Sequence, residues 1–296
     1  MTPQDSRPLG ARVTADMVGS STPLKAISWD ERDTILYALG VGAGLGDPES
    51  ELHFTTENTS GITLKAIPTM LTTLAVAAPP PALSTLDIGR FLHAEQSVEF
   101  LHPLSSQGQG FICNRIASIE DKGSGAIIRN AATLFADESG QNILARSSSS
   151  IYVRGAGGFG GPRPTSTPFI IPDRAPDFSI QQHTRPEQAL LYRLSGDRHR
   201  LHSDPQFARA RDFPRPILHG LCTYGFACRA VMTALLGAEP ERLTGMQARF
   251  VKPVFPGDSL TTQIWLTDTS NAVFQMLNSV GERVLERGTI TLRSDY

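Results

Sequence analysis

The chain has 296 residues, of which 40% are hydrophobic and 19% are charged, so it holds enough apolar material for a folded core and too much for a largely disordered protein. Its 27 basic and 29 acidic residues give a net charge of −2, without the basic excess typical of nucleic-acid-binding proteins, so we expect no nucleic-acid partner. The three cysteines form no CxxC pair, so the sequence predicts neither a disulfide framework nor a metal site.

The sequence also predicts no membrane partner. Its longest apolar stretch, around residues 66–83, contains threonine and proline and is shorter than the ~20 residues of a membrane span. The first residues lack a basic-then-apolar signal pattern, and the last three are Ser294, Asp295 and Tyr296 rather than a peroxisomal SKL tripeptide. We therefore expect a cytoplasmic protein.

In chain order, the first predicted element is a helix. Ser28 and Glu31 have the S-x-x-E spacing of a capping box, and the apolar run 35–39 follows them before a series of glycines. Segments rich in β-branched or apolar residues come next, separated by turns that contain glycine. They predict an antiparallel meander of strands over 97–101, 111–119, 126–134 and 143–153.

Residues 154–176 are dense in glycine and proline, a composition typical of a connector. They divide the chain into a predicted module over 1–153 and a second over 177–296.

The second module repeats the arrangement of the first. A helix is predicted from Gly220 to Gly237. The small residue Gly225 lies on its predicted buried face and leaves a notch there. One helix followed by antiparallel strands, twice in the chain, predicts an α+β fold of two modules. The strands of this half are predicted over 246–252, 260–266, 273–279 and 284–293.

The segment from Tyr192 to Pro205 carries the groups suited to chemistry, because Asp197, His199 and His202 fall within six residues. Histidine exchanges protons near neutral pH, and a nearby aspartate can share that work on one water molecule. Spacing alone fits a solvated polar loop equally well.

Gly220 adds a second feature, because it stands at the predicted start of a helix. Backbone N–H groups at a helix start have no intrahelical partner, and glycine lets a substrate approach them closely. An acid/base pair followed by such donors indicates chemistry on a carbonyl or a thioester.

The run Tyr192–Pro205 resembles the YxLSGDxNPLHxDP motif of the hydratase 2 group of MaoC-like enoyl-CoA hydratases. Six further blocks resemble that family in the same order: 37–43, 92–96, 121–125, 154–161, 216–223 and 248–250. The resemblance implies a double hot-dog fold, in which each module is a helix wrapped by an antiparallel sheet. It also implies that 1–153 is the non-catalytic module, which accommodates the acyl chain, and that 177–296 carries the hydratase motif.

The implied activity is (R)-specific hydration of a trans-2-enoyl-CoA to a (3R)-3-hydroxyacyl-CoA, in fatty-acyl or steroid side-chain β-oxidation. The substrate would be an acyl-CoA thioester, no separate cofactor would be needed, and we expect a homodimer. The resemblance places catalytic roles on Asp197, His202 and Gly220, with His199 in the catalytic loop. It places substrate or CoA contacts on His93, Ala94, Lys122, Arg198, Arg200, Leu201 and Phe250.

Three positions depart from the family pattern. His199 replaces the usual asparagine, Arg200 the following proline, and Ala94 a glycine. Since imidazole can donate or accept a hydrogen bond, we expect His199 to act as a neutral hydrogen-bonding group in place of the asparagine.

Other functions remain open on the sequence. An acyl-CoA thioesterase on the same fold is one alternative, and a catalytically silent acyl-CoA-binding protein is another, since His199 and Arg200 alter the loop. A purely structural module fits poorly with Asp197, His202 and Gly220. The glycine-rich run 155–161 lacks the G-x-G-x-x-G pattern, so we expect no dinucleotide site.

Overall fold

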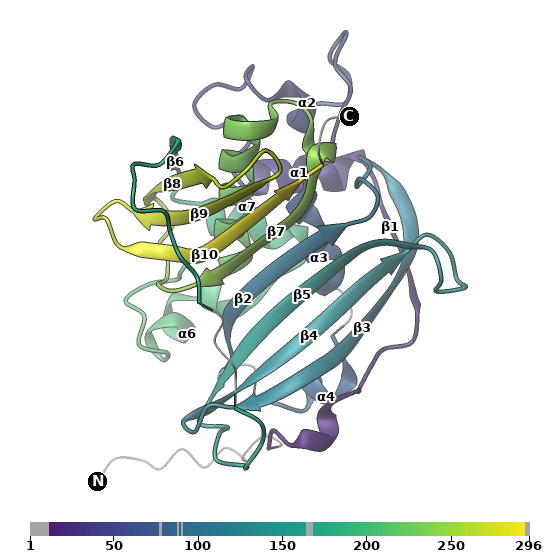
Figure 1. The fold of residues 1–296 in the computed structure, drawn as a ribbon, viewed down its shortest axis with the longest axis vertical. Coiled ribbons are helices and arrows are strands. Elements are labelled where there is room, and N and C mark those ends of the chain that lie inside the picture. Colours follow the sequence, from purple (N-terminus) through teal and green to yellow (C-terminus); the bar gives the residue numbers. More distant parts are fainter. Residues whose placement is uncertain (1–11, 77–78, 88, 90, 164–167, 294–296) are drawn as a thin grey trace.

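The computed structural model describes residues 12–76, 79–87, 89, 91–163 and 168–293. Residues 1–11, the last three residues and 164–167 of the predicted connector lie outside this part. Among the described residues, ten strands form a single antiparallel sheet (Figure 1): β1 (Lys25–Trp29), β2 (Phe91–Phe100), β3 (Gly108–Asp121), β4 (Gly125–Phe135), β5 (Ile143–Arg154), β6 (Phe178–His183), β7 (Leu243–Phe250), β8 (Ser259–Leu266), β9 (Asn271–Asn278) and β10 (Arg283–Leu292). The α-helices are α1 (Glu31–Gly40), α2 (Leu52–Thr55), α3 (Leu71–Val76), α4 (Pro81–Ser84), α5 (Gln188–Tyr192), α6 (Pro205–Arg209) and α7 (Gly220–Val231).

The strand order in the sheet is β1-β3-β4-β5-β2-β7-β10-β9-β8-β6. Read outward from the centre, the first five strands and the last five follow the same topology, since β2-β5-β4-β3-β1 corresponds to β7-β10-β9-β8-β6. The antiparallel pair β2–β7 joins the two halves, with Val98 opposite Met246. The α+β architecture with two similar halves is therefore confirmed, while the bounds 1–153 and 177–296 stay a prediction.

The eight strands expected from the sequence are all present, and several extend beyond their predicted ends. β1 and β6 were not predicted. Both are edge strands of the sheet. In β6, partly buried residues alternate with exposed ones. Short edge strands bury too little apolar surface to stand out by composition.

The predicted capping box at Ser28 is wrong. Ser28 lies in β1, where it pairs with Gln109, so its backbone is part of the sheet and not of a helix cap. The helix is capped two residues later, because the Asp30 carboxylate accepts the N–H of Asp33 and the Asp33 carboxylate accepts the N–H of Asp30. This reciprocal pair makes the same kind of box with aspartate in both positions.

Helix α7 is the buried axis of the second half (Figure 1), and its residues 221–231 are all buried. A π-helical turn over Met232–Leu236 follows it, and Gly237 ends it with a φ of +57°. The notch predicted at Gly225 is confirmed, because a Cβ there would lie 2.4 Å from Cγ1 of Val41 beside α1.

A buried ion pair also fastens α7 to the first half. The Arg229 guanidinium, on a residue only 7% exposed, donates to both carboxylate oxygens of Glu51 and to the carbonyl oxygen of Val41. In the first half, the short α3 packs on β4 and β5. In the described part of the chain, none of the helices combines the length and the apolar character that a membrane span requires.

Candidate active site

A cavity of about 870 Å³ is lined by residues from both halves of the sheet and from the segment that precedes α7. Most of the residues that the sequence singled out meet at its wall. They are His93, Ala94, Asp197, His199, Leu201, His202, Gly220 and Phe250. The structure thus brings both predicted proton-transfer groups and the predicted helix start to one cavity.

Local turns hold the loop over residues 196–204 in place. Gly196, with a φ of +128°, reverses the chain directly before Asp197, a conformation that side chains with a Cβ rarely adopt. A 3₁₀ turn over Arg200–His202 then presents His202. At the far end of the loop, the Asp204 carboxylate accepts the first N–H groups of α6. Turns therefore flank Asp197 and His202 on both sides of this loop.

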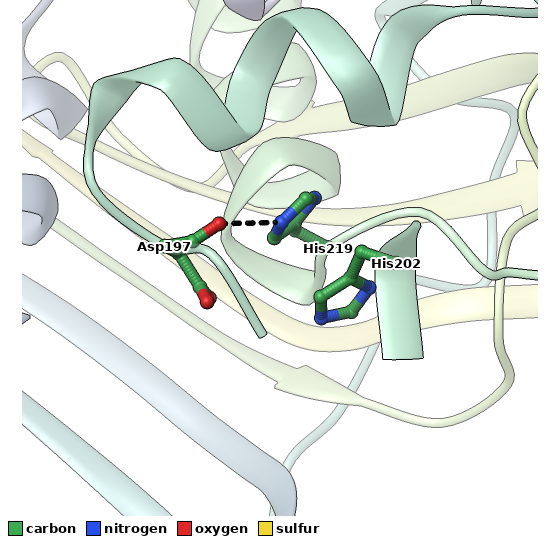
Figure 2. Close-up of side chains that lie close together, drawn as sticks. All are labelled: Asp197, His202 and His219. Carbon is green, nitrogen blue, oxygen red and sulfur yellow. Dashed lines mark hydrogen bonds between the residues drawn. The ribbon is translucent and has the colours of Figure 1, made fainter. Parts of the chain in front are cut away.

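Asp197, His202 and His219 form a compact cluster, which Figure 2 shows in close-up. One nitrogen or oxygen of each side chain lies within 4.8 Å of those of the other two. A water molecule with two hydrogen bonds of about 2.8 Å spans about 4.5 Å between its partners. The separation therefore lets Asp197 and His202 hold one water between them.

The hydrogen bonding of His202 fixes which of its nitrogens is free. Its Nδ1 lies 2.9 Å from the carbonyl oxygen of Ile217, and because a carbonyl only accepts, Nδ1 carries the proton and Nε2 keeps its lone pair. Burial lowers the pKa of His202 below its ordinary value, against the opposing effect of Asp197. The ring is thus a neutral base near pH 7.

His219 belongs to this site, although we did not predict it from the sequence. Its Nε2 donates to the backbone carbonyl of Asp197 at 3.1 Å, drawn as the dashed line in Figure 2. Its ring stacks on that of His202 with the centroids 3.7 Å apart. Burial lowers the pKa of His219 to about 3, with the neighbouring His202 adding to the effect, so the ring stays neutral. Its one sequence signal was its place directly before Gly220.

His199 replaces asparagine in a way that keeps one hydrogen bond. Its Nδ1 accepts the N–H of Leu201 at 3.3 Å. In asparagine, Oδ1 is the same number of bonds from Cβ as Nδ1 is in histidine, so it can accept the same N–H. The ring also meets Phe207 edge-on, 5.5 Å between centroids. Burial lowers the pKa of His199, while Asp197 acts to raise it. This geometry suits a neutral imidazole, since protonated Nδ1 would face another N–H.

Gly220 is the first residue of α7, and the helix start beside it is open. His219, the residue before it, makes no side-chain cap, so the first N–H groups of the helix lack intrahelical acceptors. Gly220 and Leu221 line the cavity. A Cβ on Gly220 would lie 3.2 Å from Cε1 of Phe250, which is closer than ordinary contact. The glycine therefore lets both the ring and a ligand approach the helix start.

Phe250 in turn packs against His93, with ring centroids 4.7 Å apart. His93 Nε2 donates to the carbonyl oxygen of Glu95 at 3.1 Å, and burial lowers the pKa of His93 to about 4. The part of the cavity wall formed by His93 and Phe250 is therefore uncharged near pH 7, and an apolar group can lie against it.

Lys122, Arg198 and Arg200 do not line this cavity. Lys122 is exposed in the turn between β3 and β4, and Arg198 is exposed in the same loop as Asp197. Arg200 pairs with Asp204 and lies over the ring of Phe207, with 5.0 Å to the ring centroid. Their contact with CoA stays a prediction.

The glycine-rich run after β5 has a structural partner. Asp121 accepts the N–H groups of Gly123, Gly158 and Gly160 at 2.7–2.9 Å. These bonds, with that from Gly158 foremost, lower the pKa of the Asp121 carboxyl. The glycine N–H groups therefore bind a carboxylate of the protein.

By donor type, Asp197, His202 and His219 could also ligate a divalent cation. The geometry is unfavourable for one. The two imidazole planes are inclined by only 26°, so lone pairs in the ring planes do not converge on a tetrahedral point. Nε2 of His219 is also occupied by its bond to Asp197.

Comparisons with known proteins point in one direction. Residues 27–155 match the family described as MFE-2 hydratase 2 N-terminal domain, and residues 169–287 match the MaoC like domain. The chain is 42% identical to 3-hydroxyacyl-thioester dehydratase Y of Mycobacterium tuberculosis, over 89% of this chain and 91% of the relative. It is 34% identical to peroxisomal enoyl-CoA hydratase 2 of Arabidopsis thaliana, over 84% and 86%.

Solved structures agree. A MaoC-like dehydratase from Phytophthora capsici superposes with a TM-score of 0.83 at 30% identity, covering 96% of this chain and 99% of that one. A Mycobacterium tuberculosis protein with a double hot-dog fold gives a TM-score of 0.59 at 12% identity, covering 97% and 99%. The predicted double hot-dog fold is thereby confirmed.

Proposed function

The chain belongs to the MaoC-like hydratase 2 family of enoyl-CoA hydratases, and we propose that Asp197, His202 and the start of α7 carry out its reaction. That reaction is the (R)-specific hydration of trans-2-enoyl-CoA to (3R)-3-hydroxyacyl-CoA, a step of β-oxidation. The observation that supports the site most strongly is the placement of the Asp197–His202 pair, within reach of one shared water, in the same cavity as the uncapped helix start at Gly220.

The proposed reaction begins with the thioester carbonyl on the N–H of Gly220 and a water between Asp197 and His202. Nε2 of His202 accepts a proton from the water as its oxygen bonds to C3. The electron pair of the C2–C3 double bond moves to the thioester, and the helix start stabilises the enolate oxygen. The proton then bonds to C2 on the same face, which restores neutral His202 and completes the addition of one water. These steps require no metal, flavin or nicotinamide.

Two rival functions give different products. A thioesterase would release free CoA, and a silent binding protein would retain enoyl-CoA unchanged. The test is to incubate the purified protein with trans-2-enoyl-CoA and to analyse free thiol and the 3-hydroxyacyl product by chiral chromatography. We expect the 3R alcohol and no thiol release. Thiol release, a 3S product or unchanged substrate would each contradict the proposal.

A cytoplasmic location and a homodimer are also proposals. Fractionation of the native host tests the first. Light scattering on the purified chain tests the second.

A further inference from the structure

The cavity wall contributed by the first half, which is expected to hold the acyl chain, carries a group of polar side chains. It includes Thr72, Gln96, Asn114, Asn130, Ser147 and Ser149. Apolar residues such as Leu83 and Ile151 also line this half, so the polar groups form a local zone rather than an open wet surface.

The sheet register explains why these side chains gather. Gln96 pairs with Ser149, and Ser149 with Asn130. Residues directly opposite each other in an antiparallel sheet point to the same face, so the three form one row across β2, β5 and β4. At about 4.8 Å between strands, Asn130 lies about 10 Å from Gln96 across the sheet.

Some of these polar side chains form hydrogen bonds with one another or with nearby backbone groups. Gln96 Nε2 donates to Ser147 Oγ at 2.8 Å and to the carbonyl of Ser97. Asn130 Nδ2 donates to Asn114 Oδ1 at 2.9 Å, and Asn114 Nδ2 donates to the carbonyl of Ala75. These bonds orient the three amide groups in the structure.

Away from Gln96, the row contains groups that lack a hydrogen-bond partner in the described part of the chain. Asn130 Oδ1 is buried and has no donor among the described residues. Ser149 lies beside Asn130 in the row. Its hydroxyl makes no hydrogen bond with another group in the described part of the chain. An alkyl chain over the Ser149 hydroxyl would exclude water without replacing its hydrogen bonds, and it would leave Asn130 Oδ1 unpaired.

We propose that the acyl group taken by this cavity bears a hydroxyl, several carbons from the thioester, that binds Asn130 and Ser149. The hydroxyl can donate to Asn130 Oδ1 after a small rotation of the amide, and it can accept from Ser149. Apolar walls discriminate weakly between acyl groups, whereas a site with buried hydrogen-bonding groups strongly disfavours the analogue that lacks the partner. The proposal rests on the proposed function and names the substrate class of the same site.

The test compares trans-2-enoyl-CoA esters of one chain length, unsubstituted or with a single hydroxyl moved along the distal chain. For the wild type we expect kcat/KM to be at least ~10-fold higher for one hydroxyl position than for the unsubstituted ester. Equal values at every position, or preference for the unsubstituted ester, would overturn this inference while leaving hydration intact. Absence of hydration of every ester would instead contradict the proposed function.

Variants test whether Ser149 and Asn130 cause the preference for a hydroxylated ester. Ser149→Ala and Asn130→Leu should each lower the ratio of kcat/KM between hydroxylated and unsubstituted esters toward one. Ser148→Ala is the matched control: Ser148 pairs with Ser97 and Ala131 on the other face of the same strand, so the ratio should stay that of the wild type. The ratio is measured within each variant, so partial loss of folded protein does not alter it. An unchanged ratio in Ser149→Ala and in folded Asn130→Leu would refute the assignment.

Discussion

The imidazole rings of His202 and His219 stack with centroids 3.7 Å apart and planes inclined by 26°. The same His219 ring donates to the backbone carbonyl of Asp197. One neutral side chain thus contacts both members of the proposed catalytic pair. His219 is a positioning residue in this account, since it shields His202 from water and fixes the backbone that carries Asp197.

Replacement of His219 should therefore change the titration of His202 as well as the rate. In His219→Ala, water reaches His202, so its pKa rises toward the ordinary value and the acid limb of kcat/KM moves to higher pH. We expect kcat to fall about 10-fold or more. The control is His183→Ala, because His183 lies on β6 and bonds to Ser259. A lower rate with an unshifted pH profile would mean that His219 only supports the fold.

The wild-type pH profile follows from the lowered pKa values of His199 and His202. Both rings are needed neutral, so kcat/KM should hold as the pH falls to the ordinary imidazole value of about 6.5 and drop only below it. His199→Asn should remain active, since asparagine can accept the same N–H of Leu201. A profile that falls already above pH 7, or an inactive His199→Asn enzyme, would contradict these roles.

The same shifts affect stability. A histidine whose pKa is lower in the folded state binds protons first in the unfolded chain. His93, His199, His202 and His219 all have lowered pKa values. The free energy of unfolding should therefore be largest above about pH 6.5 and decrease as the pH falls below it. Urea titrations across this range measure the trend, and a gain in stability on acidification would disagree with it.

Gly220 offers a test of the helix start. In Gly220→Ala, the new Cβ presses on Phe250 and occupies space next to the thioester, so kcat/KM should fall by at least about 10-fold with little change in melting temperature. Gly245→Ala is the matched control, since its Cβ would meet Thr291 at 3.4 Å, an ordinary contact in β7. If both variants retained wild-type kcat/KM, the oxyanion donor would have to be sought at another N–H.

The Arg229–Glu51 pair should matter for stability rather than for rate. Glu51→Gln leaves the buried guanidinium without its counter-charge, and we expect a loss of about 3–5 kcal/mol in the free energy of unfolding. The exposed pair Arg146–Glu99 provides the comparison, since Glu99→Gln should cost no more than about 1 kcal/mol. Equal losses in the two variants would rule out a special role for the buried pair.

The sequence predicted most of the fold because its strands and α7 carry strong local patterns. Edge strands β1 and β6 lack such a pattern, and Asp30 rather than Ser28 caps α1 because the β1 backbone extends through Ser28. At the site, Asp197 and His202 were found through their motif. His219 was missed because its stacking on His202 joins two segments that only tertiary folding brings together. The polar row was missed because serine and asparagine in a strand do not reveal which face they take until the register is known.

The central claim is that Asp197 and His202 together hold the reacting water and that His202 transfers its proton. The most direct measurement is kcat for hydration of a saturating trans-2-enoyl-CoA by Asp197→Asn and His202→Ala, with circular dichroism to verify that each variant is folded. The account predicts that each variant loses about 10²–10⁴-fold in kcat. Near-wild-type kcat in both folded variants would contradict it.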